Sequence, residues 1–323
     1  MDSQIVIVLA AFNGADYLGE QLASLIAQTQ TRWELLIRDD GSTDDTLGII
    51  GDYVARDKRI RILPGDGPAG SACGNFAVLL EAAYAQGAKY IFCCDQDDVW
   101  EINKLERVLA CLKQTEGESG AACLVHHDLA VVNESLEPLA DSFVDMMKLQ
   151  PGDQNNPQRL ISRNEVTGCA LACNRALLEI ALPLSRQAIM HDWWLAMCAA
   201  YFGQLVFIPD KLVKYRQHGK NTIGSKSFWH GLNPFSNWMA GWKRGDEEFL
   251  KTVRQAGAFQ STMTDRLKKE PAHFVALERY KMLPVVSRWQ RLRTLGQCGL
   301  WRSQWLLDVV IVMRMLLLPR GSI

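Results

Sequence analysis

The chain has 323 residues, of which 48% are hydrophobic and 22% are charged. This composition is typical of a globular protein and excludes a fibrous or a disordered one, and the length predicts one large α/β domain with an appendage, or two domains. The net charge is −1, but residues 1–225 carry 19 basic and 29 acidic side chains, whereas residues 226–323 carry 16 and 7. We therefore expect different partners: metal and polyphosphate for the acidic part, and an anionic surface for the basic part.

Cysteine usage and the apolar runs indicate the compartment. The nine cysteines are scattered and form no C-x-x-C pair, which argues against a disulfide framework or a zinc knuckle and favours a reducing compartment. The first ten residues lack the basic start of a signal peptide. The longest apolar run, 305–318, is interrupted by Asp308 and Arg314, so it predicts no membrane span. We expect a cytoplasmic protein, peripheral at most on the inner face of the cell membrane.

Strand-like runs alternate with amphipathic helical stretches through the first half of the chain, a pattern typical of a parallel sheet covered by helices. Strands are predicted at residues 4–10, 34–38, 59–63 and 89–94, and helices near 18–26, 43–56, 75–84 and 101–112. Further on, strands are predicted at 122–126, 168–173, 205–208 and 212–216, with a helix at 192–201. Helical periodicity then dominates, near residues 245–267, 273–294 and 301–318.

Two acidic motifs directly follow predicted strands. Asp95-Gln96-Asp97-Asp98 comes after strand 89–94. Ligands of open α/β sheets bind outside the carboxyl ends of the strands, and crowded carboxylates repel each other unless a hard cation such as Mg²⁺ or Mn²⁺ neutralises them. The motif therefore predicts a metal and diphosphate site; the alternative is a solvated acidic turn that caps the next helix.

The second strand ends at Asp39 and Asp40, which precede Gly-Ser-Thr. A carboxylate at this position accepts hydrogen bonds from a base or a ribose, as the acidic residue of dinucleotide-binding folds does. The alternative is a turn followed by a helix cap. Residues 65–70 match the GxGxxG motif literally, which suggests an NAD site. We reject this interpretation because the fingerprint belongs after the first strand. We expect a flexible loop beside the nucleotide instead, with Asn75 helping to close it.

Two further motifs lie in the acceptor half of the chain. His191-Asp192-Trp193 begins a predicted helix, so an ionised Asp192 can take a proton from an acceptor hydroxyl; the alternative is a helix cap followed by core tryptophans. Arg216 and His218 follow the last strand and are placed to meet diphosphate oxygens, unless they form an ordinary polar strand end. A GxSxG elbow and a Walker sequence are both absent, so neither a serine hydrolase nor a P-loop enzyme is indicated.

The segments AFNGADYL, DDGSTDDT, DQDDVW, HDWW and YRQHGKN, in this order and spacing, resemble family 2 glycosyltransferases with the GT-A fold, and in particular bacterial rhamnosyltransferase-like enzymes of O-antigen or capsule synthesis. The resemblance covers about residues 1–222. It implies an inverting transfer in which Asp40 contacts a pyrimidine base, Asp95 and Asp97 hold the metal and the diphosphate, and Asp192 is the general base. The QxxRW signature of processive synthases is absent, which favours addition of a single sugar.

The patterns and the resemblance together assign the site residues. The catalytic base is Asp192. The nucleotide is expected to contact Ala11, Phe12, Asn13, Asp39, Asp40, Asn75 and Asp95. The metal, Mg²⁺ or Mn²⁺, is expected to be held by Asp97, Asp95 and His218. The acceptor or the sugar is expected to contact Asp98, Trp100, Gly168, His191, Trp193 and Arg216.

The resemblance also bears on the substrates. It implies transfer of a hexose or 6-deoxyhexose, with dTDP-rhamnose favoured as donor and UDP-glucose or UDP-galactose as the alternative. The acceptor is expected to be a hydroxyl of a saccharide or of a lipid-diphosphate-linked saccharide. Two other classes remain as alternatives. A sugar-phosphate nucleotidyltransferase would carry a Gly-rich loop with a basic residue after the first strand, which this chain lacks, and a non-catalytic membrane-surface protein would not bind nucleotide with metal.

We expect a catalytic domain at residues 1–224, with a nucleotide-binding half at about 1–100 and an acceptor half at about 101–224, and a helical region at 225–323. That region holds six of the ten tryptophans. Its arginines include Arg288, Arg291, Arg293, Arg302 and Arg314. This composition suits helices at an anionic membrane surface. Packing on the catalytic domain or on a second copy, as a homodimer, is the alternative, and long aliphatic runs such as 309–312 argue against nucleic acid.

Overall fold

The computed structural model describes residues 4–65, 67–151, 157–219, 238–297 and 305–318. The chain forms two compact units. The first comprises residues 1–152, 165–184 and 190–229, and the second comprises residues 153–164, 185–189 and 230–323. The predicted boundary at residue 224 and the side chains of Trp229, Trp301 and Arg302 lie outside the described residues.

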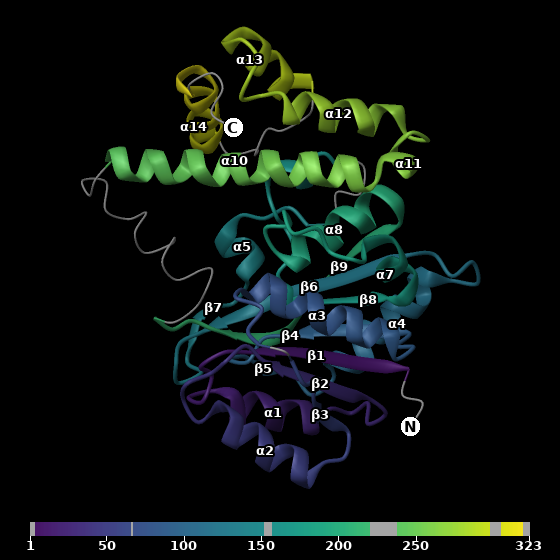
Figure 1. Ribbon diagram of the computed structural model, residues 1–323. Coiled ribbons are helices and arrows are strands. Elements are labelled where there is room, and N and C mark those ends of the chain that lie inside the picture. The colour runs from purple at the N-terminus through teal and green to yellow at the C-terminus, as the bar shows by residue number, and fades with distance from the viewer. Residues whose placement is uncertain (1–3, 66, 152–156, 220–237, 298–304, 319–323) are drawn as a thin grey trace. The chain divides into compact units, whose positions relative to one another are not determined.

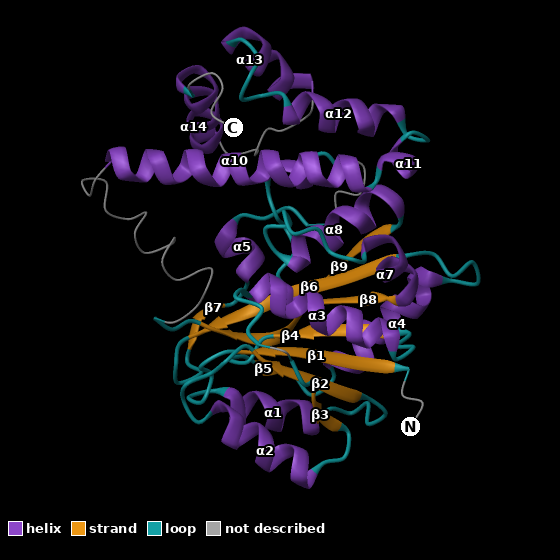
Figure 2. Ribbon diagram, viewed as in Figure 1, coloured by secondary structure: helices purple, strands orange, loops and turns teal. Residues whose placement is uncertain are grey.

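A single mixed sheet forms the centre of the first unit (Figures 1 and 2). Its strand order is β3-β2-β1-β4-β8-β6-β9-β5, and β7 pairs with β6. The first four strands in this order run parallel, and β8 pairs antiparallel with both β4 and β6. The strands are β1 Ile5–Ala11, β2 Glu34–Asp39, β3 Ile60–Ile62, β4 Tyr90–Cys94, β5 Val99–Trp100, β6 Cys123–Val132, β7 Pro138–Ala140, β8 Leu171–Asn174 and β9 Gln204–Arg216.

Helices cover both faces of this sheet, so its central strands are apolar on both sides. In β1, Ile7 and Leu9 belong to the core that α1 and α4 cover, whereas Val6 and Val8 alternate with them and are equally buried. Helix α3 packs on β1 and β2. The helices of this unit are α1 Leu18–Ile26, α2 Thr46–Arg56, α3 Ala72–Ala85, α4 Lys104–Glu116, α5 Phe143–Met147, α7 Arg175–Ala181 and α8 His191–Phe202.

Several elements differ from the sequence-based predictions, and three of the differences have a clear local cause or form. The strands predicted at 205–208 and 212–216 are one strand, β9, whose pairing with β6 shifts register around Pro209 and Asp210. Such a bulge interrupts the alternation of side chains without ending the strand. The strand predicted at 168–173 begins with a 3₁₀ turn, Gly168–Ala170. The helix predicted at 273–294 is two helices, because the chain turns at Pro284.

The second unit is helical. It contains α6 Arg159–Ser162, α10 Trp238–Thr262, α11 Thr264–Leu267, α12 Pro271–Lys281, α13 Arg288–Gln297 and α14 Trp305–Leu317. Helix α10 packs on α12 and α6, and α13 packs on α14. Within the described ranges, every helix is too short or too polar to cross a lipid bilayer.

Two arginines expected at a membrane surface have structural roles instead. Arg291 is fully buried, and its guanidinium donates to the carbonyls of Leu283, Pro284, Met315 and Leu318. Arg314 pairs with Asp246 at 2.8 Å. Periodicity does not reveal these contacts, because the partners are carbonyls and a carboxylate distant in sequence. These two arginines therefore stabilise the helical unit itself and do not supply the surface charge that the composition of the region suggested.

Candidate active site

The loop after β1 is fastened to the loop after β2 by hydrogen bonds. Asn13 has a φ of 48°, a left-handed conformation that asparagine tolerates well. The amides of Asn13, Gly14 and Ala15 donate to Ser42 Oγ, Thr46 Oγ1 and Asp44 Oδ2 at 2.8, 2.8 and 3.1 Å. Asn13 Oδ1 accepts from the Thr43 amide at 2.8 Å. The polar residues of the DDGSTDDT segment thus hold the carboxyl ends of two neighbouring strands together.

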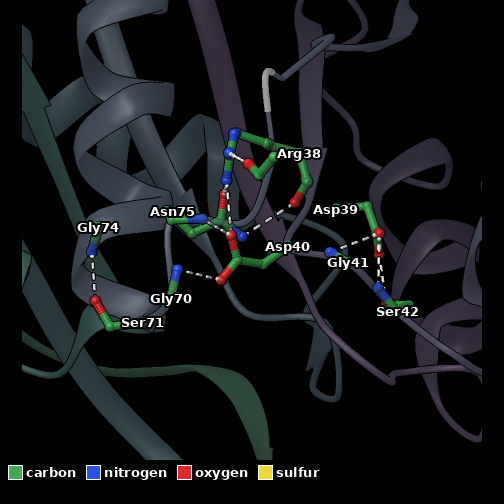
Figure 3. Close-up of polar contacts among 11 residues, drawn as sticks. Arg38, Asp39, Asp40, Gly41, Ser42, Gly70, Ser71, Gly74 and Asn75 are labelled. Carbon is green, nitrogen blue, oxygen red and sulfur yellow. Dashed lines mark hydrogen bonds and ion pairs between the residues drawn. The ribbon is translucent and has the colours of Figure 1, made fainter.

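The two aspartates that end β2 differ in their surroundings. The Asp39 carboxylate accepts from the amides of Gly41 and Ser42 at 3.0 and 2.9 Å and from the Ser42 hydroxyl, so it forms the turn itself. Asp40 is buried and pairs with Arg38 at 2.9 Å, as Figure 3 shows. The turn interpretation therefore describes Asp39, and Asp40 is the carboxylate directed into a polar network with Asn75.

The acidic segment after β4 lies on the other side of β1. Asp97 Oδ2 is 2.9 Å from His218 Nε2, and Asp98 Oδ1 accepts from the Arg216 amide at 3.0 Å. Gln96 bonds both the amide and the carbonyl of Phe12, at 2.8 and 2.9 Å. The sheet thus brings the predicted metal ligands, the β1 loop and the last-strand residues together at one edge.

Burial and mutual repulsion disfavour the ionised forms of the carboxylates in this cluster. Burial, then the charges of Asp97, Asp98 and Asp192, raise the pKa of Asp95 well above its usual range. Burial and Asp97 raise the pKa of Asp98 to about 7. Asp98 Oδ2 is buried and has no hydrogen-bond partner in the part of the chain that is described. A divalent cation relieves both the repulsion and the unpaired oxygen, so the residues present fit a metal.

Among the described residues, one group of three possible metal ligands differs from the predicted set. Oxygens of Asp95 and Asp98 and the Cys169 sulfur lie within 4.8 Å of one another. The Cys169 thiol is a soft ligand, which suits zinc or copper better than Mg²⁺ or Mn²⁺. Mg²⁺ and Mn²⁺ prefer carboxylate oxygens, so Asp98 joins Asp95 as a candidate ligand beside the predicted Asp97 and His218.

Lys104 is a site residue that the sequence analysis missed. It is fully buried at the start of α4, donates to the Cys169 carbonyl at 2.6 Å, and lies 3.5 Å from the centre of the Trp100 ring. Burial lowers its pKa to about 8, while Cys169, Cys94 and Asp98 oppose this. One signal was available: Lys104, Val108 and Leu112 share one helix face, so a lysine stands on an apolar stripe.

Two residues predicted to contact ligands are instead buried beside the acidic segment. Trp100 is 3% exposed and lies under the Lys104 ammonium. Arg216 is 1% exposed; its Nε donates to the Asp97 carbonyl at 2.8 Å, and its terminal nitrogens bond the Glu134 carbonyl and Glu20. Arg216 therefore fixes the backbone of the acidic segment in this structure.

Asp192 lies in the first turn of α8, where the helix dipole favours its negative charge. Its Oδ1 accepts from the Trp193 amide at 2.6 Å, and its charge acts on Asp95. A Cβ on Gly168 would lie 3.0 Å from His191 Cε1 and 3.5 Å from Asp192 Oδ2, so a glycine allows this close approach. The helix start is thereby packed closely against the 3₁₀ turn Gly168–Ala170.

The residues around Asp192 are well buried. His191 stacks on Phe76 with ring centres 3.8 Å apart, and burial lowers its pKa to about 3, so the ring is neutral. Both His191 ring nitrogens are buried without a partner among the described residues. Trp193 is 9% exposed and Trp194 is fully buried. The neighbours predicted to contact the acceptor are thus mostly internal in this structure.

The mixed sheet, with carboxylates at the ends of β2 and β4, has the GT-A type of fold. The family model "Glycosyl transferase family 2" matches residues 6–178, more than half of the chain, so the protein belongs to this family. The fold agrees with the crystal structure of residues 1–349 of TarS from S. aureus in complex with UDP, with a TM-score of 0.53 at 14% identity over 96% of this chain and 89% of that one.

Three relatives illustrate the family. An uncharacterised glycosyltransferase of Nostoc is 28% identical over 68% of this chain and 66% of its own length. The dTDP-rhamnosyl transferase RfbG of Shigella flexneri is 27% identical over 67% of this chain and 74% of its own. The UDP-Glc:alpha-D-GlcNAc-diphosphoundecaprenol beta-1,3-glucosyltransferase WfgD of Escherichia coli is 25% identical over 56% of this chain and 63% of its own. The matches thus span about two thirds of these relatives.

Proposed function

We propose that this protein is an inverting, metal-dependent glycosyltransferase that moves one hexose or 6-deoxyhexose from a pyrimidine nucleotide-sugar to a hydroxyl of a saccharide or lipid-linked saccharide in cell-surface polysaccharide synthesis. The observation that carries this proposal is the cluster of Asp95, Asp97 and Asp98, in which Asp98 is buried and the other two are half-buried, and whose carboxylates repel one another and feel the charge of the base candidate Asp192. A turn that only capped a helix would be solvated and would not need this surplus of negative charge.

Asp95 and Asp97 would hold the Mg²⁺ or Mn²⁺ ion, with His218 beside Asp97 as the third ligand. When bound, the ion supplies positive charge to the diphosphate and so stabilises the departing nucleoside diphosphate. The protein keeps the acidic segment rigid for this purpose: Arg216 holds the Asp97 carbonyl from one side, and Gln96 holds the β1 loop from the other. Rigid placement of the ligands is what lets a metal act without reorganisation.

Asp192 would act as the general base. Its carboxylate takes the proton of the acceptor hydroxyl while the hydroxyl oxygen attacks the anomeric carbon, and the bond from that carbon to the diphosphate oxygen breaks with its electron pair leaving on the diphosphate. One displacement of this kind inverts the anomeric centre and needs no covalent glycosyl-enzyme. The first-turn position of Asp192 favours the ionised form that the step requires.

The relatives guide the choice of donor. The dTDP-rhamnosyl transferase RfbG supports dTDP-rhamnose, and the glucosyltransferase WfgD supports UDP-glucose as the second candidate. The diphosphoundecaprenol in the latter's name supports a lipid-diphosphate-linked acceptor. Because these relatives are less than 30% identical, the sugar is the part of the proposal that most needs measurement.

An acceptor of this kind would bring the protein to a membrane, and the second unit offers a suitable surface. Trp289 on α13 is 80% exposed and is flanked by the exposed Arg288 and Arg293. Helix α14 exposes apolar side chains at helical spacing: Val309, Val310, Met313 and Leu317. Tryptophan and arginine together suit an anionic interface. We propose peripheral binding to such a membrane; flotation with anionic but not with neutral vesicles tests it, and a concentration-dependent dimer without flotation would favour self-association.

The central test is a panel of nucleotide-sugars assayed for slow hydrolysis and for thermal stabilisation with Mn²⁺. We expect a dTDP- or UDP-sugar to score in both assays. In the Asp192→Asn variant, transfer to the identified acceptor should fall by about a hundredfold to a thousandfold while donor binding stays within about twofold. Transfer near the wild-type rate in this variant would exclude Asp192 as the base.

A further inference from the structure

Arg38 stands two residues before Asp40, at the end of β2, and its guanidinium lies in the polar network of Figure 3. Its side chain is 5% exposed and that of Asp40 is 9% exposed. Nη1 bonds Asp40 Oδ1 and Asn75 Oδ1, both at 2.9 Å, and Nη2 bonds the Gly67 carbonyl at 2.6 Å. A strand-end arginine is thus turned inward, toward the carboxylate expected to meet the base.

The hydrogen bonds of Asp40 leave it little free capacity. A carboxylate has about four lone-pair positions, two on each oxygen. Oδ1 accepts from Arg38 Nη1 and from the Ala69 amide, and Oδ2 accepts from the Gly70 amide at 3.1 Å. These are the hydrogen bonds of the Asp40 carboxylate within the described residues. One position therefore remains, and it is on Oδ2.

The surroundings hold Arg38 in this place. Asn75 accepts from Nη1 and donates its Nδ2 to the Arg38 carbonyl at 3.1 Å, so it grips both ends of the residue. A Cβ on Gly65 would lie 3.1 Å from Nη2, so the absence of a side chain there makes room for the guanidinium. Arg38 Nε is buried without a partner in the described ranges, an unfavourable state for a donor. The guanidinium thus keeps its bond to Asp40 although its Nε–H group has no hydrogen-bond acceptor among the described residues.

We propose that Arg38 is a positioning residue that sets the base specificity of the donor: by filling Asp40 Oδ1 it leaves a single acceptor, which suits the one imino N–H of uracil or thymine and excludes guanine. This inference rests on the proposed function, in which Asp40 contacts the base. Guanine presents two adjacent donors, and pairing them with one carboxylate requires a free position on each oxygen. Cytosine presents a ring acceptor beside its amino group, which the carboxylate repels.

The inference is tested by nucleotide binding alone, without any transfer reaction. We would titrate UDP, dTDP, GDP and CDP into the full chain with Mn²⁺ by calorimetry. The wild type should bind UDP and dTDP at least about a hundredfold more tightly than GDP, since an unpaired buried donor is costly. In Arg38→Met, which keeps the apolar stem but frees Oδ1, the ratio of UDP to GDP affinity should fall at least about tenfold.

Because Arg38 is buried, Arg38→Met could destabilise the fold. A second variant, Gly65→Ala, disturbs the guanidinium without removing it. Gly65 is exposed, and Gly65→Ala presses on Nη2 without removing any group. It should lower the same ratio about threefold to tenfold at an unchanged unfolding temperature. Gly51→Ala is the matched variant, because a Cβ there meets nothing within 4 Å, and it should leave the ratio unchanged.

The outcomes separate this inference from the proposed function. If the wild type binds none of the four nucleotides, the proposed function fails and the inference fails with it. If the wild type prefers UDP but folded Arg38→Met and Gly65→Ala keep the full ratio, the proposed function stands and the role of Arg38 is refuted. A reduced ratio with unchanged metal dependence supports the inference, because a merely structural role would weaken all nucleotides equally.

Discussion

The acidic motifs after β2 and β4 occupy equivalent places, at the carboxyl ends of two parallel strands that flank β1, but their carboxylates are in opposite electrostatic states. After β2, donors surround each carboxylate. Asp39 bonds the Ser42 turn, and Asp40 bonds Arg38 and two loop amides. Burial is the largest single influence on Asp44 and opposes its ionisation, but the hydrogen bonds from Thr46 and Ala15 together outweigh it, and the pKa of Asp44 lies below its ordinary value.

After β4, like charges surround each other. The pKa values of Asp95 and Asp98 are raised by burial and by neighbouring carboxylates, and the buried Lys104 is the cation that opposes this on both. The comparison teaches that one position in the fold serves two kinds of chemistry. The β2 carboxylates are largely paired within the protein, whereas the β4 carboxylates carry a surplus of negative charge that a cation would neutralise.

The largest expected effect is that of Asp95→Asn, which should raise stability but lower activity. Asp95→Asn removes one of the repelling charges, so we expect the unfolding temperature in chelator to rise by a few degrees while transfer falls by about a thousandfold or more, because a metal supplies several kcal/mol to the transition state. Thermal melts with EDTA and single-sugar transfer assays measure the two effects. A variant that was less stable and still active would show that Asp95 is paired in some other way.

Removal of the internal cation should act in the opposite direction. In Lys104→Met the carboxylates lose their buried partner, and we expect the free energy of unfolding to fall by about 3 kcal/mol, with Mn²⁺ recovering part of it. Denaturant titration with and without Mn²⁺ is the measurement. Lys113→Met, at an exposed position of the same helix, is the matched control and should change the free energy by less than about 0.5 kcal/mol. If both substitutions changed the free energy of unfolding equally, Lys104 would have no electrostatic role.

The β2 motif should respond without any change in metal dependence. Asp40→Asn places an amide against Arg38 and two backbone donors, so we expect UDP affinity to fall about tenfold and stability to fall slightly, while the Mn²⁺ requirement persists. Calorimetry over a series of Mn²⁺ concentrations reports both. Asp52→Asn, on the exposed face of α2, is the control. If Asp40→Asn bound UDP without Mn²⁺, the two motifs would not act independently, which would contradict this prediction.

The smallest effect concerns the bonds between the first two loops. Thr46 is fully buried, and its hydroxyl accepts from the Gly14 amide. Thr46→Val keeps the shape but leaves that amide unpaired, and we expect it to lower the free energy of unfolding by about 1 kcal/mol. Thr46→Ser, which keeps the hydroxyl, should cost less. Denaturant midpoints that rank the serine variant below the valine variant would contradict this hydrogen-bonding role.

Local patterns predicted much of this molecule. Strand-end aspartates and the alternation of strands and helices are local signals, and they placed Asp40, Asp95 and Asp97 at one edge of a sheet of the confirmed GT-A type. The roles that depend on distant partners were not visible. Lys104 bonds a carbonyl 65 residues away, and Arg216 bonds one 119 residues away, so neither the buried cation nor the backbone brace follows from spacing.

Periodicity also failed where a regular element is interrupted. The bulge around Pro209 and Asp210 divides the pattern of β9 and predicted two strands in place of one. In the helical region, the sequence pattern shows only that position 291 is polar, so Arg291 looked like a surface charge. The pattern does not show that its guanidinium donates to four carbonyls distant in sequence. Tertiary contacts override local propensity in both cases.

In the proposed mechanism, the carboxylates after β4 require a cation to bind the donor diphosphate. Calorimetric titration of UDP into the wild-type chain and into Asp97→Ala, each with Mn²⁺ and each with EDTA, tests it most directly. We predict binding in one of the four experiments, the wild type with Mn²⁺, and a loss of at least about a hundredfold in the other three. Equal UDP affinity in EDTA, or in Asp97→Ala with Mn²⁺, would contradict the metal site and with it the proposed mechanism.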